Sequence, residues 1–336
     1  MGIPTDLDKS SMKELIAFFP KMIGLSDLPQ VVESEAKNLS KASPKGIIMV
    51  GMGGSSIAGQ YCSELLLNES RIPLLIIRDY DLPGYVDKNW IVVAVSYSGN
   101  TEETISCFNA AKQRNCESFI ISSGGELTQL GERNRVTPLP KGLQPRATLP
   151  LIFSAEFQLI RMLSGLEKFN FDATRVSVEA ARSLWGNHIS HPSVLSERIQ
   201  HKIPVFMGAH HLDAAAYRAK CQINENAKSA AFYASIPEAN HNEVEAVGTY
   251  SKHDITVVLM RSSFESASMS RRFDVTKEIY EEEEVDVNEI RMKFDDKVAE
   301  TLSFTHFFDE LSFQLALLNG VDSVEVPKIS RLKKKL

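Results

Sequence analysis

Short apolar runs alternate with longer stretches of helical period in the first half of the chain. The runs are rich in Val and Ile and apolar on both faces, which is typical of parallel strands covered by helices on both sides. They lie at residues 46–50, 74–77, 91–95, 118–121 and, more weakly, 136–139. Helical periods follow at 56–67, 101–114 and 127–130, whereas Pro83 and Gly84 make residues 78–89 a loop. This alternation predicts a doubly wound α/β domain.

A second series of the same kind begins near residue 201. Strands are predicted at 204–207, 229–233, 255–260 and 285–287, and helices at 213–228, 239–247, 265–281 and 299–318. Residues 47–56 and 204–213 share one outline: an apolar strand, a Gly and a helix start. We therefore predict an α/β protein with two doubly wound parallel-sheet domains flanked by helices.

The length of 336 residues fits two domains of roughly 150 residues each. We place the first domain at 1–150, with an amphipathic segment at 12–19, and the second domain at 196–336. Residues 151–195 are predicted to be a linker, helical as far as Trp185 and looser from 186 to 192. The second copy lacks the Gly-Gly-Ser-Ser turn of the first, so we expect only one kind of ligand loop.

Composition and charge limit the kinds of binding partner and the cellular location that we expect. Hydrophobic residues make up 43% of the chain, which disfavours disorder. The net charge of −6 disfavours nucleic acid or an anionic membrane as the main partner. Residues 1–10 show no signal-peptide pattern, and no apolar run approaches the ~20 residues of a membrane span. The four cysteines form no C-x-x-C pair. We expect free thiols in a cytoplasmic protein.

The sharpest motif is G-M-G-G-S-S at residues 51–56, directly between a strand and a helix. Glycines there let the backbone approach a ligand, and the N–H groups of a helix start attract an anion. A Gly-rich turn also serves nucleotide folds, but G-x-G-x-x-G and G-x-x-x-x-G-K-[ST] are both absent. Phosphate binding and a merely tight turn both remain open on this motif alone.

A second loop, S-Y-S-G-N-T-E-E-T at 96–104, follows the third strand and opens the next helix. Its hydroxyls can donate to phosphate oxygens together with backbone N–H groups, although an ordinary capped helix explains Thr101 and the following Glu residues as well. Because both loops follow neighbouring strands, we predict a phosphate site. The expected ligands are the Gly54 amide and the hydroxyls of Ser55, Ser96, Ser98 and Thr101.

With these two motifs the chain resembles the sugar isomerase (SIS) domain superfamily. Three further segments, P-R-A at 145–147, Q-I-N-E-N-A-K at 222–228 and P-E-A-N-H-N-E at 237–243, are similar to bifunctional phosphoglucose/phosphomannose isomerases of that superfamily. The match spans nearly the whole chain in the expected order. It implies interconversion of glucose 6-phosphate and mannose 6-phosphate with fructose 6-phosphate, with no cofactor and no metal.

Such an isomerase needs a base that carries a proton between C2 and C1, a group that opens the hexose ring, and a stabiliser of the cis-enediolate. The resemblance implies that Glu225 is the base and that His241 opens the ring. In the family the equivalent His comes from the other subunit, which implies a homodimer. Outside that resemblance, Glu225 would be an ordinary surface helical residue. His210 and His211 are interpreted as structural, because no ligand-spaced partners accompany them.

Arg146 is a lone cation between prolines, a rigid position that suits an enediolate stabiliser, although a phosphate clamp or an interface contact is the alternative. Near the C-terminus, Lys333 matches a family Lys that assists ring opening, and the register is open by one residue to Lys334. Val326 stands where the bifunctional enzymes carry Thr. It preserves the space but not the hydroxyl, which puts mannose 6-phosphate activity in doubt.

Two alternatives remain. One is a sugar-phosphate-binding regulator that kept the fold and lost catalysis, although the chain has no room for an added DNA-binding module. The other is an isomerase of a different phosphosugar. We expect no nucleic-acid or membrane partner.

Overall fold

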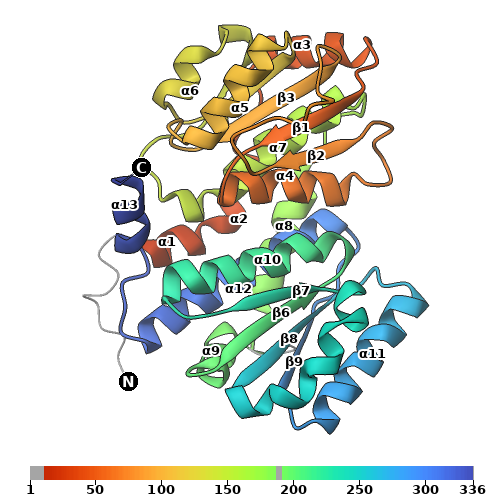
Figure 1. Ribbon diagram of the computed structural model, residues 1–336, viewed down its shortest axis with the longest axis vertical. Helices are drawn as coiled ribbons and strands as arrows, with labels where there is room; N and C mark the ends of the chain where they lie inside the picture. Colours follow the sequence, from red (N-terminus) through yellow and green to blue (C-terminus); the bar gives the residue numbers. More distant parts are fainter. Residues whose placement is uncertain (1–10, 187–190, 336) are drawn as a thin grey trace. The chain divides into compact units, whose positions relative to one another are not determined.

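The computed structural model describes residues 11–186 and 191–335, and the chain divides into two compact units. The N-terminal unit comprises Phe19–Arg175, and the C-terminal unit comprises Met1–Phe18 with Val176–Leu336. Each unit is built on one parallel sheet (Figure 1). The predicted absence of a signal pattern at residues 1–10 and part of the looser stretch at 186–192 fall outside the described residues.

The N-terminal unit holds five parallel strands in the order β2-β1-β3-β4-β5. They are β1 (Gly46–Val50), β2 (Leu74–Ile77), β3 (Trp90–Ser96), β4 (Glu117–Ser122) and β5 (Val136–Pro138). The helices are α2 (Phe19–Met22), α3 (Gln30–Ser40), α4 (Gly54–Leu65), α5 (Glu102–Gln113), α6 (Gly125–Leu130) and α7 (Leu149–Leu163). All five residues of β1 are buried, as expected for a strand covered on both faces.

Alternation along the strands sends side chains to two cores. Ile48 and Val92 pack with Cys107 of α5 on one face of the sheet. On the other face Met49 lies against α4, where a Cβ added at Gly59 would stand 3.2 Å from the Met49 Cβ. Helices therefore cover both faces, which confirms the doubly wound fold predicted from the sequence.

The C-terminal unit holds four parallel strands in the order β7-β6-β8-β9. They are β6 (Ile203–Gly208), β7 (Phe232–Ser235), β8 (Ile255–Arg261) and β9 (Val287–Arg291). Its helices are α1 (Met12–Ala17), α9 (Pro192–Ile199), α10 (Asp213–Gln222), α11 (Ala267–Glu282), α12 (Lys297–Leu318) and α13 (Pro327–Lys333), while α8 (Phe171–Ser183) crosses the boundary between the units. The order repeats that of the first sheet without its last strand, which supports the predicted duplication.

Two cores flank this second sheet as well. Val205 and Val257 pack with Phe273 of α11 on one face. On the other face the Phe206 ring lies 5.3 Å from the Phe308 ring of α12. No helix within residues 11–186 or 191–335 is long and apolar enough to cross a lipid bilayer.

Four predicted elements of the C-terminal unit differ from the structure. The helix predicted at 239–247 is a pair of 3₁₀ turns, η6 (Glu238–His241) and η7 (Glu243–Thr249). The helix predicted at 213–228 leaves α geometry after Gln222 and continues as a π turn, η5 (Ile223–Ala227). The strands expected at 229–233 and 285–287 begin at Phe232 and Val287, because Ser229 and Val285 still bond back to the preceding turns.

Candidate active site

The glycine-rich loop of the N-terminal unit connects the carboxyl end of β1 to α4. Gly53 has a φ of +54° and a Cβ there would meet nothing within 4 Å, so the loop borders open space. At Gly51 a Cβ would lie 2.9 Å from the carbonyl oxygen of Val95 in β3, so only glycine lets the loop lie this close to the next strand. Ser55, in the first turn of α4, is 8% exposed.

The hydroxyl-rich loop connects the carboxyl end of β3 to α5. The Ser96 and Thr101 hydroxyls lie 2.8 Å apart, and the Gly99 N–H donates to Ser96 Oγ at 3.1 Å. Ser98 is exposed, and its Oγ accepts from the Asn100 N–H at 3.3 Å. Gly99 has a φ of +71°, and a Cβ there would stand 1.7 Å from the Gly124 carbonyl oxygen. The loop is therefore held in one conformation by its own hydrogen bonds and by β4's following turn.

These two loops flank the point where the sheet reverses its order. The chain passes from β1 to β2 on one side and from β3 to β4 on the other, so the crevice between β1 and β3 is the switch point of a doubly wound sheet. Ligands of open α/β sheets bind in this crevice, outside the carboxyl ends of the strands. The structure thus brings the loop of Gly54 and Ser55 and the loop of Ser96, Ser98 and Thr101 to the two sides of this crevice.

Arg146 lies in a short 3₁₀ turn, η3 (Pro145–Ala147), next to this crevice. A Cβ added at Gly54 would lie 3.8 Å from the Pro145 carbonyl oxygen. From the other loop, the Tyr97 hydroxyl donates to the Pro140 carbonyl at 2.8 Å and accepts from the Leu143 N–H at 3.0 Å. The hydroxyl-rich loop is therefore hydrogen-bonded to the segment that ends at the half-buried Arg146, and the glycine-rich loop lies beside it.

Sequence reasoning missed two residues near this crevice. One is Tyr97, whose position between two hydroxyl residues was the available signal. The other is Arg78, directly after β2, whose Nε donates to Ser56 Oγ at 3.1 Å while its other end bonds Gln60. Ser56 in turn donates to the Gly53 carbonyl at 3.0 Å. Arg78 thus supports the start of α4 through Ser56, and it adds positive charge on the side of the loop where the sequence motif has none.

In the C-terminal unit, Glu225 lies in the middle of the π turn η5 that follows α10. Such turns are rare and occur frequently at functional sites. Glu225 is half-buried, whereas its neighbours Asn226 and Ala227 are buried. Lys228 ends the turn with a φ of +55°, and its Nζ donates to the Glu225 carbonyl at 2.9 Å.

A buried polar network anchors this turn to α12. Arg218 of α10 donates to both carboxylate oxygens of Asp309, at 2.9 and 2.8 Å, and Gln222 donates to the same carboxylate at 2.8 Å. Asn226 donates to Ser312 Oγ at 2.9 Å. Arg218 and Asp309 are both almost fully buried, so the pair holds the end of α10 against α12. The π turn with Glu225 continues from that end, and its orientation is set by this joint.

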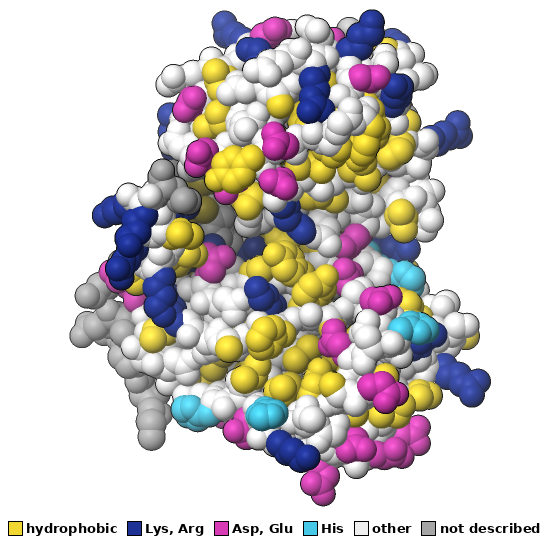
Figure 2. Space-filling view, in the orientation of Figure 1, with side chains coloured by type: hydrophobic (Ala, Val, Ile, Leu, Met, Phe, Trp, Pro, Cys, Tyr) yellow, Lys and Arg dark blue, Asp and Glu magenta, His cyan; other side chains and the backbone are white. Residues whose placement is uncertain are grey.

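The chain that leads to Lys333 starts beside the same turn. Asn319, just after α12, donates to the Ala227 carbonyl at 3.1 Å and to Ser229 Oγ at 2.9 Å. The Lys228 ammonium also bonds the Asp322 carbonyl. Lys333 itself ends α13, for which Val326 is the N-terminal cap residue. Lys333 and Lys334 are exposed, and α13 forms a basic surface segment (Figure 2).

His241 lies beyond the carboxyl ends of the strands of the second sheet, whereas Glu225 lies toward their amino ends. His241 ends the 3₁₀ turn η6, six residues beyond the carboxyl end of β7, and it is exposed. Glu225 lies after α10, which runs from the carboxyl end of β6 back toward the amino end of β7. Since α10 has ten residues, it carries the chain about 15 Å along the sheet. Glu225 and His241 of one chain are therefore at opposite ends of the strands of their sheet.

The adjacent histidines differ. His210 is exposed, whereas His211 is buried and its Nε2 lies 2.7 Å from a Glu300 oxygen, which is the structural role expected for it.

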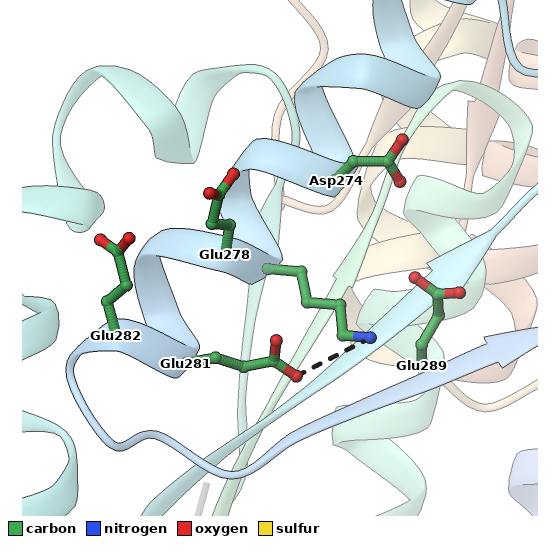
Figure 3. A pocket seen from close by; sticks show the side chains of 6 residues that line it. Asp274, Glu278, Glu281, Glu282 and Glu289 are labelled. Carbon is green, nitrogen blue, oxygen red and sulfur yellow. Dashed lines mark ion pairs between the residues drawn. The ribbon is translucent and has the colours of Figure 1, made fainter.

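An open acidic depression of about 590 Å³ lies on α11 and β9 (Figure 3). Its lining consists of Asp274, Lys277, Glu278, Glu281, Glu282 and Glu289. One ion pair lies along its α11 wall, with Lys277 Nζ 3.7 Å from Glu281 Oε1. A surface dominated by carboxylates repels a sugar phosphate, so this depression is not the substrate site. Within the described ranges, no three His, Cys, Asp or Glu residues form a metal-binding group.

Two parallel doubly wound sheets, the first with hydroxyl- and glycine-rich loops at its switch point, place the chain among α/β proteins of the SIS-domain class. Tagatose-6-phosphate ketose/aldose isomerase from Escherichia coli has the same fold, with a TM-score of 0.75 at 17% identity over 94% of this chain and 95% of that chain. The bacterial phospho-glucose isomerase C-terminal SIS domain matches residues 190–336.

Sequence relatives indicate to which family within this class the chain belongs. A bifunctional phosphoglucose/phosphomannose isomerase from Caldicellulosiruptor bescii is 33% identical over 303 residues, 86% of this chain and 89% of that protein. A D-glucosamine-6-phosphate 4-epimerase from Sulfolobus acidocaldarius is 32% identical over a shorter stretch, 67% of this chain and 71% of that protein. The chain belongs to the bifunctional phosphoglucose/phosphomannose isomerase family.

Proposed function

We propose that the protein is an aldose–ketose isomerase that interconverts glucose 6-phosphate and mannose 6-phosphate with fructose 6-phosphate in the cytoplasm, without a cofactor or a metal. The observation that carries this proposal is the pair of loops at the first switch point, one hydrogen-bonded to the Arg146 segment and the other beside it. Hydroxyls and backbone amides there suit a small phosphate monoester, which a nearby cation then orients. Family membership supports the sugar as a hexose.

The proposed reaction begins with the phosphate held by the Gly54 amide and the hydroxyls of Ser55, Ser96, Ser98 and Thr101. His241 and Lys333 move the proton between the ring oxygen and the C1 hydroxyl, which opens the hexose. Glu225 removes the C2 proton of the aldose and returns it to C1, while the O2 hydroxyl proton passes to O1, so C1 becomes a hydroxymethyl group and C2 becomes the ketone. Arg146 stabilises the negative charge of the cis-enediolate between these steps.

We propose further that the working unit is a homodimer in which His241 comes from the other chain. The support is the position of the two groups at opposite ends of the strands of one sheet, about the length of α10 apart. A hexose phosphate is shorter than that, so one C-terminal unit cannot present both groups to the same sugar. Two chains related by a two-fold axis supply the missing His reciprocally.

The test is a coupled assay of the purified protein with each aldose phosphate in parallel, with a metal chelator present. Turnover of both sugars is the expected result. Turnover of glucose 6-phosphate alone would make the enzyme narrower, and a Val326→Thr variant would then be expected to restore mannose 6-phosphate turnover. No turnover of either sugar would contradict the proposal.

Glu225→Gln removes the base while keeping the side-chain volume. We expect kcat to fall about 10²–10⁴-fold, the usual contribution of a positioned general base, with binding of fructose 6-phosphate retained. The matched control is Glu179→Gln, an exposed position on α8, which should leave kcat unchanged. Full activity of the Glu225 variant would remove the central role assigned here.

The epimerase relative favours a second candidate, conversion of an aminosugar phosphate. This activity would use the same phosphate loops with different chemistry at the sugar. Assaying glucosamine 6-phosphate beside the two hexose phosphates separates the two, because the proposed isomerase should turn over the hexose phosphates far faster. Tight binding of every phosphosugar with no turnover would instead indicate a regulator.

A further inference from the structure

The second sheet has a switch point of its own. Its order, β7-β6-β8-β9, places the reversal between β6 and β8, the same position that holds the candidate phosphate loops in the N-terminal unit. The loop after β6 carries His211, and the loop after β8 carries Ser262 and Ser263. No Gly-Gly-Ser-Ser turn occurs here, which raises the question of what fills the crevice.

A carboxylate of the chain itself fills it. Glu300, in the first turn of α12, is completely buried, and three donors converge on it. The Ser263 N–H donates to Oε1 at 2.6 Å. On Oε2, the Ser262 hydroxyl donates at 2.6 Å and His211 Nε2 lies at 2.7 Å. Both oxygens of the carboxylate are therefore satisfied.

The donors are of the kind that a phosphate site uses, since a serine hydroxyl and a backbone N–H follow the strand that corresponds to β3. Neighbouring contacts hold them in place. Ser262 Oγ also accepts from the Phe264 N–H at 2.9 Å, and the His211 ring packs edge-on against Phe264 at 5.7 Å. The Thr301 hydroxyl, next to Glu300, donates to the His211 carbonyl at 3.2 Å. These rigid donors form an oxyanion site whose ligand is a carboxylate of the same chain.

The N-terminal unit provides a contrast. Glu156 on α7 is equally buried, but neither of its carboxylate oxygens has a hydrogen-bond partner among the described residues. Burial alone therefore does not surround a carboxylate with donors. The buried Asp309 also has donors, but they are side chains of α10, whereas those of Glu300 come from the two loops of the switch point.

We propose that the C-terminal unit retains an oxyanion-binding site at its switch point and that Glu300 is its permanent internal ligand. The site takes a carboxylate in the native chain and accepts a small free carboxylate when Glu300 is truncated. This inference is independent of the isomerase activity proposed above. The first switch point thus borders open space, whereas the second is closed by a side chain of the chain itself.

Chemical rescue tests this site. Glu300→Ala removes a group of the size of acetate, and we expect a fall in Tm that added acetate reverses more than chloride at equal ionic strength. Glu156→Ala is the matched control, because it creates a similar buried space without donors, and acetate should raise its Tm no more than chloride does. Equal responses of the two variants would overturn the proposal.

A second pair of variants decides the matter if Glu300→Ala does not fold. Glu300→Gln keeps the volume but presents an NH₂ group to donors, so its Tm should fall by several degrees. Glu156→Gln removes an unpaired carboxyl and its Tm should rise. Opposite signs support a built oxyanion site at Glu300, whereas a rise in both would overturn it.

Discussion

At the scale of single residues, Glu156 is a fully buried carboxyl group with no hydrogen-bond partner among the described residues. It lies on α7 facing Gly59 of α4, where a Cβ would stand 3.0 Å from Glu156 Oε1. Burial raises its pKa well above the ordinary value. The pKa of the neighbouring Cys62 thiol is also raised, mainly by burial and secondly by the charge of Glu156 when it is ionised. In the folded protein Glu156 therefore keeps a proton that the unfolded chain releases.

This proton makes stability depend on pH with a definite sign. Because the folded pKa is raised, the contribution of Glu156 is fully present below its unfolded pKa and is lost as pH rises toward the folded pKa. We expect Glu156→Gln to be more stable than the wild type, with an advantage that grows by about 1.4 kcal/mol per pH unit across that window. Urea unfolding at a series of pH values measures it. A difference independent of pH would contradict the assignment, and Glu179→Gln is the control.

At the scale of elements, the joint between α10 and α12 decides how the π turn is held. Arg218 and Asp309 form a buried, doubly hydrogen-bonded pair. Burial raises the pKa of Asp309, and the Arg218 charge opposes that effect. Breaking one side of such a pair leaves an uncompensated buried charge.

Asp309→Ala is expected to lower the free energy of unfolding by about 3–5 kcal/mol and to lower kcat more than it raises KM. The double variant Arg218→Met with Asp309→Leu replaces the pair by apolar packing. It should recover most of the stability, as denaturant unfolding would show, but not kcat, because Glu225 loses its direction. Recovery of kcat together with stability would mean that the pair has only a structural role.

Much of the fold could be predicted from the sequence, because strands buried on both faces are apolar at every position. The 46–50 run needed no tertiary information. The π turn could not be predicted, since Ile223–Ala227 has helical periodicity and only the network with Asp309 and Ser312 shows where the helix widens. The prediction of one helix near His241 is wrong because Asn242 interrupts it. Its side chain accepts from the Glu243 N–H and starts a second, separate 3₁₀ turn.

The candidate site was predictable to the extent that it consists of loops. Gly54, Ser96 and Thr101 follow strand ends, and parallel strands bring their carboxyl ends to one edge. Arg78 and Tyr97 were missed because their contribution depends on contacts across the fold, with Ser56 for one and with residues 140–143 for the other.

At the scale of the whole molecule, sharing of sites between two chains has a clear signature. If Glu225 and His241 of one site come from different chains, a dimer of one Glu225→Gln chain and one His241→Gln chain contains one intact site and one doubly altered site. Mixing the two inactive variants under exchange should therefore restore about one quarter of wild-type activity, by statistical pairing in a two-fold dimer. The coupled isomerase assay before and after mixing measures this.

The control for mixing is a pair of variants from the same contributed set, such as Glu225→Gln with Glu225→Ala, which should stay inactive. If the sites were each built from one chain, the Glu225 and His241 variants would stay inactive as well.

The double hydrogen bond of Tyr97 has a consequence for how such enzymes diverge. It joins the loop around Ser98 to the segment ending at Arg146, so that neither can shift without the other. If these two parts hold the phosphate and stabilise the intermediate as proposed, a lineage adapting to a longer or differently branched substrate has to move them together. By contrast, Glu225, His241 and Lys333 lie on three different elements of the C-terminal unit, η5, η6 and α13, so a substitution near one of them need not move all three.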